Sequence, residues 1–331
     1  MSNNSELKTW HRIYRQMLRI REVESEIALR YSEGNMRCPT HLSIGQECVP
    51  SVIGELTSKE DKAVSTHRCH AHFLGKGGNL RNMVAEIYGK KDGCSQGKGG
   101  SMHLIDKKAG FMGSSAIVGN SIAMGTGIGL AMKLNKRNNV SIVYLGEGAT
   151  EEGVFYESLN FAALKNLNVA FICENNLYSV YSPLSVRVPS NRSNIEIAKA
   201  CGIRRYGKHD GNNMQEVYSV VKNTFEDIRL HGGPTFLEFT TYRWLEHCGP
   251  NYDNNIGYRT EEEYLHWTKK DPISIARAEL ARQSIDFEGQ ESEMKKQIRD
   301  EVAQTFKYAE QCKYPSKEEA YTHIYAEIKD Q

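Results

Sequence analysis

Apolar residues recur every three or four positions along the first part of the chain. Between Trp10 and Tyr31 they are separated mainly by arginine and glutamate, and the pattern stops at Gly34. This spacing predicts a long amphipathic helix over about residues 6–34.

Beyond this helix, helical patterns alternate with short apolar runs. Strands are expected at 62–66, 140–145, 169–173 and 235–241, and helices at 80–88, 117–134, 153–165 and 214–230. Such alternation is typical of a mainly parallel sheet with helices on both faces. From about Asp271 the chain is helical and highly charged, and Pro272 suits a first helical turn.

No internal repeat or low-complexity linker divides the chain, which indicates a single domain over residues 1–331. The expected fold class is α/β, with a core over about 40–245 and helical extensions at about 6–34 and 271–331. Two stretches are expected to be ordered loops: 89–115, which holds seven glycines, and 178–193, which follows a strand. Such loops at the carboxyl ends of strands commonly bind ligands.

Composition narrows the function classes. The 331 residues are 39% apolar, enough for a sizeable core, and 42 basic against 41 acidic residues leave a net charge of +1. This balance favours small-molecule substrates and gives no reason to expect a nucleic-acid or anionic-membrane surface. No long apolar run or signal peptide is present, so a cytoplasmic protein is expected, with its eight cysteines reduced and mostly buried.

One segment carries recognisable chemistry. A strand ends at Gly146-Glu147-Gly148, a crossover helix follows, and the next strand ends at Asn175-Asn176. Because this βαβ unit brings both strand ends to one edge of the sheet, Glu147 and Asn176 are expected to be neighbours. Their oxygens suit Mg²⁺ or Ca²⁺, and the glycines allow close approach of a phosphate. Taken alone, the two glycines favour a tight βα turn.

The same motif is similar to that of thiamine-diphosphate enzymes, in which G-D-G is followed after about thirty residues by N-N. Further segments resemble the α subunit of the decarboxylating first component of 2-oxo acid dehydrogenase complexes, including the pyruvate, branched-chain and acetoin enzymes. These segments are Gly97–His103, Ala116–Gly119, Cys173–Asn176 with Tyr178, Thr241–Arg243, Gly257–Thr260 and Asp271–Ile273. The resemblance extends from about Tyr14 to Leu280, so it covers most of the chain.

The resemblance implies a thiamine-diphosphate-binding fold and the oxidative decarboxylation of a 2-oxo acid, with acyl transfer to a lipoyl group. It implies that Arg68 binds the diphosphate and that Val118 holds the cofactor in a bent form. Mg²⁺ would be held by Glu147, Asn176 and the carbonyl of Tyr178. The implied cofactor contacts are His67, Arg68, Ala116, Val118, Glu147, Gly148, Ala149, Asn176, Tyr178 and His247.

Histidines carry the implied proton chemistry. His41 and His247 align with active-site histidines of the family, and His70 follows the Arg68 motif, so all three are expected to be catalytic. A structural role is the alternative for each of them. A metal site formed by His67, His70 and His72 is disfavoured, because the spacing matches no zinc signature.

The resemblance also implies that the site is incomplete. In this family the glutamate that activates the pyrimidine lies on a separate β chain, so an α₂β₂ assembly is expected, with a lipoyl-bearing acyltransferase as a further partner. The sequence departs from the family in four places. Glu147 stands for Asp, His67 for a frequent Tyr, Leu245 for the first histidine of an entrance loop, and Cys248 for a serine that some relatives phosphorylate. These changes leave the metal geometry and the choice of 2-oxo acid open.

Three alternatives remain. A carboligase would use the same cofactor and pass its acyl group to an aldehyde. A nicotinamide-dependent oxidoreductase would need G-x-G-x-x-G after a strand, which the glycines at 125, 127 and 129 do not provide. A non-catalytic scaffold would not need Arg68, Asn176 and His247 together. Close packing of the helix over 117–134, which in the family lies at a subunit contact, is the expected reason for these glycines.

Overall fold

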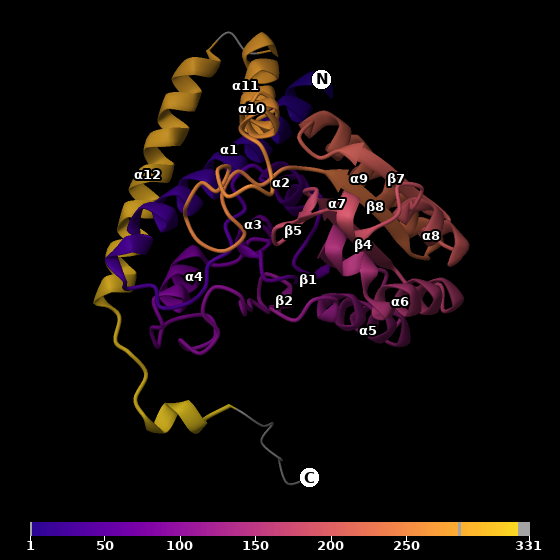
Figure 1. The fold of residues 1–331 in the computed structure, drawn as a ribbon, viewed down its shortest axis with the longest axis horizontal. Helices are drawn as coiled ribbons and strands as arrows, with labels where there is room; N and C mark the ends of the chain where they lie inside the picture. Colours follow the sequence, from indigo (N-terminus) through magenta and orange to yellow (C-terminus); the bar gives the residue numbers. More distant parts are fainter. Residues whose placement is uncertain (1, 284–285, 324–331) are drawn as a thin grey trace.

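A six-stranded parallel sheet forms the centre of the molecule (Figure 1). The computed structural model describes residues 2–283 and 286–323. The sheet has the order β2-β1-β3-β4-β8-β7, and every neighbouring pair is parallel. Its strands are β1 Lys62–Ser65, β2 Phe111–Ser114, β3 Ser141–Gly146, β4 Val169–Asn175, β7 Arg205–Asp210 and β8 Thr235–Thr240, and a separate antiparallel pair is β5 Tyr178–Ser179 with β6 Ser182–Pro183.

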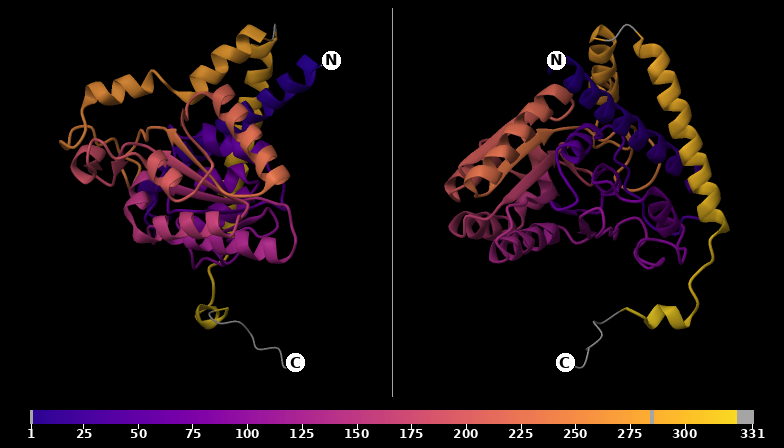
Figure 2. Two further views of the ribbon diagram at one scale, coloured as in Figure 1. Left: turned by 90° about the vertical axis from the view of Figure 1, so that its right-hand side faces the viewer. Right: turned by 180° about the vertical axis from the view of Figure 1, so that it is seen from behind.

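Helices cover both faces of the sheet (Figure 2). The α-helices are α1 Ser2–Arg30, α2 Cys48–Glu55, α3 His70–Gly75, α4 Leu80–Ile87, α5 Asn120–Leu134, α6 Gly153–Leu164, α7 Leu184–Arg187, α8 Asn194–Ala200, α9 Met214–His231, α10 Glu261–Thr268, α11 Pro272–Gln283 and α12 Phe287–Gln311. The 3₁₀ segments are η1 Tyr31–Glu33, η2 Glu147–Glu151 and η3 Glu318–Tyr321. No helix in the described part of the chain is both long enough and apolar enough to cross a membrane.

Strand alternation divides the core into two layers. Ile142 and Tyr144 of β3 pack in the cluster that contains α1, α2, α9 and α12, whereas Val143 and Leu145 pack against α5, α6 and α8. Both layers are apolar because a parallel strand is covered on its two faces. The α/β class predicted from the sequence is therefore confirmed, including the mainly parallel sheet.

The helix expected over 117–134 begins later, at Asn120, after Gly119 with a φ of +80°. Inside α5, a Cβ at Gly125 would collide with Val143, and one at Gly129 would collide with Val169. Close packing of α5 on the sheet therefore accounts for these two glycines. Gly127 has no atom within 4 Å of its Cβ position and lies on the open side of the helix.

Several short elements were not predicted. Strand β2 lies inside the expected glycine-rich loop, and β5, β6 and α7 lie inside the second expected loop. Strand β7 alternates half-buried and exposed residues at the sheet edge, so it lacks an apolar run. Helices α2, α3 and α8 have at most eight residues, too few for a clear helical period.

The helical ends largely follow the prediction. Apolar residues of α1 are buried, and α12 packs along α1 and α4 at the edge of the molecule (Figure 1). The predicted C-terminal extension over 271–331 includes residues 284–285 and 324–331, which lie outside the described residues. All eight cysteines are free, but only Cys48, Cys69 and Cys173 are buried, so the prediction of mostly buried thiols was wrong.

Candidate active site

Four neighbouring strands end at one small cavity. The segments that follow β1, β3, β4 and β8 supply Arg68, Glu147, Asn176 and His247, which all line it. Its volume is about 80 Å³, room for a few water molecules. The other lining residues are Gln46, Thr66, His67, His72, Ser115, Ile117, Val118, Gly119, Leu145, Gly146, Gly148, Ala149, Glu174, Tyr178, Ser179 and Val180.

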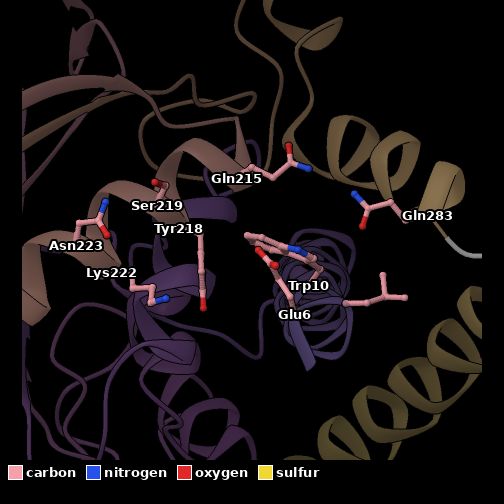
Figure 3. Close-up of a pocket in the computed structure, with 9 residues that line it drawn as sticks. Glu6, Trp10, Gln215, Tyr218, Ser219, Lys222, Asn223 and Gln283 are labelled. Carbon is pink, nitrogen blue, oxygen red and sulfur yellow. The ribbon is translucent and has the colours of Figure 1, made fainter. Parts of the chain in front are cut away.

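A larger groove of about 770 Å³ lies elsewhere, between α1, α9 and α11 (Figure 3). Trp10 and Tyr218 meet edge to face in it at 4.6 Å, and the remaining lining is mainly amide, hydroxyl and charged side chains on helix surfaces. No cluster of titratable groups converges there. The smaller cavity is the better candidate because it lies at the carboxyl edge of the sheet.

We call Glu147 and Asn176 the carboxylate end of the cavity. Glu147 begins the 3₁₀ turn after β3 and is buried, and its Oε1 accepts a hydrogen bond from Arg187 Nη2 at 2.6 Å. Burial raises the pKa of Glu147 above its ordinary value, and the charge of Arg187 opposes this rise. Glu147 therefore lies at the cavity, as expected, but it is paired with Arg187, which the sequence did not indicate.

Asn176 is held in a network of short polar contacts. Its Nδ2 donates to Gln46 Oε1 at 3.0 Å, and its Oδ1 accepts from the backbone N–H of Tyr178 at 3.3 Å. The turn after β4 contains Leu177 with a φ of +74° and Val180 with a φ of +56°. Such left-handed conformations are uncommon for branched residues and are often found at ligand sites.

The oxygens at this end fit a hard divalent cation. The carboxylate of Glu147, the amide oxygen of Asn176 and the carbonyl of Tyr178 belong to residues that line one cavity. The Glu147 carboxylate is buried, and oxygen atoms are the donors that Mg²⁺ prefers. The residues present therefore suit a magnesium ion.

Buried polar side chains form the floor of the cavity. His72 accepts or donates hydrogen bonds at both ring nitrogens, to Ser65 Oγ and to Glu174 Oε2, each at 2.7 Å. Its ring stacks on Tyr144 with the centroids 3.8 Å apart. The second oxygen of Glu174, Oε1, is buried without a partner among the described residues. This floor was missed, because only packing brings α3 onto β4.

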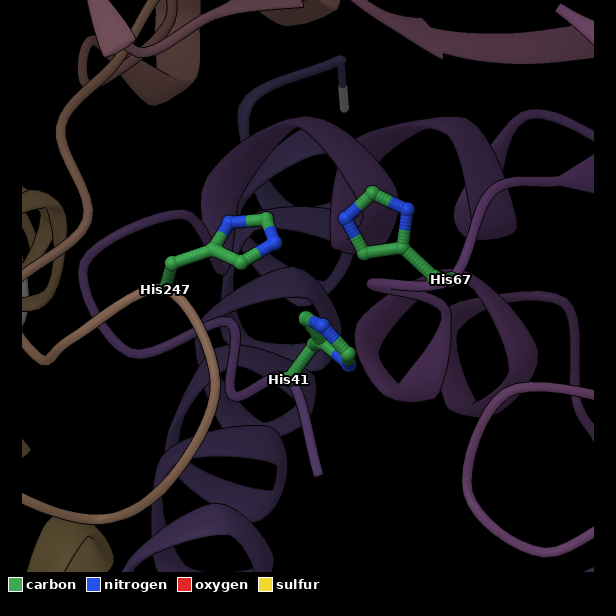
Figure 4. A group of neighbouring side chains, drawn as sticks. All are labelled: His41, His67 and His247. Atoms are coloured by element: carbon green, nitrogen blue, oxygen red, sulfur yellow. The ribbon is translucent and has the colours of Figure 1, made fainter. Parts of the chain in front are cut away.

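Three histidines lie together beside Arg68, and we call this part of the cavity the histidine end. We call His41, His67 and His247 the histidine cluster; their ring centroids lie 4.5, 4.9 and 5.3 Å apart (Figure 4). His67 and His247 line the cavity, and His41 is buried against both of them. Burial lowers the pKa of His41 to about 2, of His67 to about 4 and of His247 to about 3, and nearby Arg68 adds to each shift. The three rings are therefore neutral near pH 7.

Arg68, which the sequence analysis singled out, is buried beside the histidine cluster. It donates to the carbonyls of Leu42 at 2.6 Å and His247 at 3.1 Å. No carboxylate in the described residues lies within ion-pair distance of it, and burial lowers its pKa to about 10. A buried guanidinium without a carboxylate partner is suited to an anionic ligand such as a diphosphate.

The structure corrects the placement of His70. Its Nδ1 lies 2.6 Å from Glu24 Oε1 and its Nε2 lies 2.8 Å from Ser101 Oγ, so both nitrogens are engaged. The side chain is fully buried and does not line the cavity. His70 therefore ties α1 to the loop around Ser101, and its expected catalytic role stays a prediction.

Some, but not all, of the other expected cofactor contacts line the cavity. Gly148 and Ala149 line the cavity, and so does Val118, whose side chain is 52% exposed. Val118 is therefore not part of the buried core. Ala116 does not line the cavity, whereas its neighbour Ile117 does.

The segment after β8 was expected to form an altered entrance loop. Its shape depends on Arg243, which donates to the Leu245 carbonyl at 2.7 Å, and on Arg259, which pairs with Asp253 and donates to the Arg243 carbonyl at 2.8 Å. Leu245 is buried in the main core, so it is not an entrance residue. His247 alone of residues 244–250 lines the cavity.

A family model and relatives with similar sequences identify the same family. The model of the family described as "Dehydrogenase E1 component" matches residues 15–318. The pyruvate dehydrogenase E1 component subunit alpha of Rickettsia bellii is 34% identical over 312 residues, which are 94% of each chain. The alpha subunit of the acetoin:2,6-dichlorophenolindophenol oxidoreductase of Bacillus subtilis is 31% identical, over 98% of this chain and 95% of its own length. A solved thiamin diphosphate-dependent enzyme from Mycobacterium smegmatis is 14% identical with a TM-score of 0.41, over 62% of this chain and 33% of that one.

Proposed function

The chain belongs to the dehydrogenase E1 component family, and from this premise we propose that it is the α subunit of a thiamine-diphosphate-dependent 2-oxo acid dehydrogenase. The observation that carries the proposal is the convergence of Arg68, Glu147 and Asn176 on one cavity at the carboxyl edge of the sheet. The α subunits of pyruvate and acetoin enzymes are the relatives, which favours the dehydrogenase over a carboligase.

Each end of the cavity has a separate binding task. Arg68 would hold the diphosphate, and Glu147, Asn176 and the Tyr178 carbonyl would hold Mg²⁺. The half-exposed Val118 would contact the ring system of the cofactor, beside Gly148 and Ala149 at the phosphate end. When bound, thiamine diphosphate supplies an electron sink for the charge that develops as a 2-oxo acid loses carbon dioxide.

The histidines would handle protons around the substrate. The ring of His247 lines the cavity, where it can exchange a proton with a bound substrate, and His41 packs directly against it. His70 acts at a distance, because its contacts with Glu24 and Ser101 position the loops around the cavity. We therefore assign it a positioning role.

A β subunit would complete the site. Several large apolar side chains on and beside α5 and α6 are exposed, a feature typical of an interaction surface. They are Ile117, Val118, Met124, Leu134, Tyr156, Phe161 and Leu164. This surface adjoins the cavity through Val118, so a partner seated there would close the cofactor site from the exposed side. An α₂β₂ assembly and a lipoyl-bearing acyltransferase partner belong to the same proposal.

The first experiment is calorimetric titration of thiamine diphosphate with Mg²⁺. We expect micromolar binding to this chain co-expressed with its β partner and much weaker binding to the chain alone. Absence of binding in both samples contradicts the cofactor assignment. Turnover with an aldehyde but not with lipoamide would favour the carboligase instead.

The sharper test is Asn176→Ala in the complex with the β subunit. Loss of the amide oxygen should weaken cofactor binding in Mg²⁺ roughly tenfold or more, because an oxygen contact to an ion is removed. Asn168→Ala is the matched control, since Asn168 lies just before β4 at the far end of that strand. Unchanged affinity in the Asn176 variant contradicts the assignment of this cavity.

A further inference from the structure

Three imidazoles from distant parts of the chain converge in the histidine cluster. His41 precedes α2, His67 follows β1 and His247 follows β8. One ring nitrogen from each lies within 4.8 Å of the others. Throughout residues 2–283 and 286–323, no other set of three histidine, cysteine or acidic side chains brings its ligand atoms so close together.

The state of these rings suits metal binding. A histidine ligates a metal through a neutral ring, and burial keeps all three rings neutral at pH 7. His41 Nδ1 is buried without a hydrogen-bond partner in the described structure. Figure 4 shows the nitrogens of His67 and His247 facing each other across the gap beside His41.

Proton transfer alone does not account for this arrangement. One imidazole suffices as a general base, whereas here two further neutral rings surround the same point. Arg68 lies nearby and contacts His247 Nδ1 at 3.4 Å, a long hydrogen bond. Its shorter bonds to the carbonyls of Leu42 and His247 would remain if the His247 ring turned its other nitrogen to a metal.

We propose that His41, His67 and His247 form a binding site for a borderline divalent transition metal of the Zn²⁺ class. Imidazole nitrogen suits such ions, whereas the oxygens of the carboxylate end suit Mg²⁺, so the two ends of one cavity bind different classes of metal. Three protein ligands leave a fourth position open. Under the proposed function, a bound ion occupies His41 and His247 and thereby inhibits proton transfer.

The experiment is calorimetric titration of ZnCl₂ into the tag-free complex with the β subunit, without thiamine diphosphate, followed by Co²⁺ titration with visible spectroscopy. We expect one ion per α chain, and intense Co²⁺ bands typical of four-coordinate nitrogen ligation. Because the metal is added alone, failure of this test leaves the proposed function untouched. Absence of stoichiometric binding, or weak six-coordinate Co²⁺ bands, overturns the proposal.

His67→Phe removes one donor and retains an aromatic ring. Its Zn²⁺ affinity should fall at least tenfold, since even an outer-shell partner of a metal ligand is worth roughly 10–100-fold. The matched control is His266→Phe on the exposed surface of α10. If the His67 variant does not assemble, His247→Gln replaces it. Equal affinity in wild type and an assembled cluster variant contradicts the proposal and indicates a surface site.

Discussion

The carboxylate end and the histidine end of the cavity differ in how their buried charges are paired. At the carboxylate end, Glu147 is buried and neutralised by Arg187 within the chain. At the histidine end, Arg68 is buried without a carboxylate, among three neutral imidazoles. One end therefore has its charges paired internally, whereas the other has an unpaired cation.

This difference indicates which contacts a ligand must supply and which it must displace. Arg68 has no carboxylate partner, so an anion that binds it displaces none and gains the full charge-assisted hydrogen bonds. A cation reaching Glu147 competes with Arg187, whose guanidinium contacts both Glu147 and Glu151. The carboxylate end should therefore accept metal most readily together with a phosphate group that brings further negative charge.

The largest expected effect follows from removing the unpaired cation. Arg68→Met should weaken cofactor binding by about 4 kcal/mol, roughly a thousandfold, because two charge-assisted hydrogen bonds of a bidentate contact are lost. Calorimetric titration with thiamine diphosphate, and separately with inorganic pyrophosphate, measures the effect. The affinity of Arg68→Lys should lie between those of wild type and Arg68→Met, since a point charge cannot make the bidentate contact.

The control for this prediction is Arg81→Met on the exposed surface of α4, where the same change should leave pyrophosphate binding intact. If Arg68→Met binds pyrophosphate as tightly as wild type, the contrast between the two ends is wrong, and the anion is held elsewhere.

A smaller effect is expected from breaking the pair at the carboxylate end. The side chains of Arg187 and Glu147 are only 12% and 2% exposed, so Arg187→Gln strands a buried carboxylate and should cost about 3 kcal/mol of unfolding free energy. The pKa of Glu147 would then rise further above its already raised value. A raised native pKa means that protonation stabilises the fold, so the loss should grow as pH rises above about 4.5.

Chemical denaturation at pH 5 and pH 7.5 checks this prediction. Glu147→Gln in the Arg187→Gln background should recover most of the loss, because no buried charge remains. A pH-independent loss that the second substitution does not recover would show that Arg187 acts through packing alone.

The smallest effect concerns protons at the histidine end. The pKa of His67 is lowered to about 4 by burial, so the unfolded chain binds a proton below pH 6.5 that the native chain does not. Between pH 6 and pH 5, stability should therefore fall by up to about 1.4 kcal/mol for each such histidine. His67→Phe should flatten this dependence by about one proton, measured from unfolding free energies between pH 5 and 6.

His266→Phe again controls for the substitution. An unchanged slope in the His67 variant would mean that the ring is charged in the native state. The histidine end would then resemble a cluster of cations rather than neutral rings beside one cation.

The sequence by itself determined the framework of the site. The alternation of strands and helices, with Gly146-Glu147-Gly148 and Asn175-Asn176 at consecutive strand ends, is sufficient to place Glu147 and Asn176 at one edge. A right-handed parallel crossover has few alternatives, so local pattern translates directly into position there. The resemblance added Arg68 and His247, and both line the same cavity.

Only the tertiary structure decided which side chains contact each other. The pairing of Arg187 with Glu147, the His72–Glu174 floor and the histidine cluster join segments far apart in the chain. It also moved His70 and Leu245 away from the cavity and into buried packing. Periodicity and spacing record which face of its own element a residue occupies, whereas these contacts depend on how separate elements pack, and on the burial that follows.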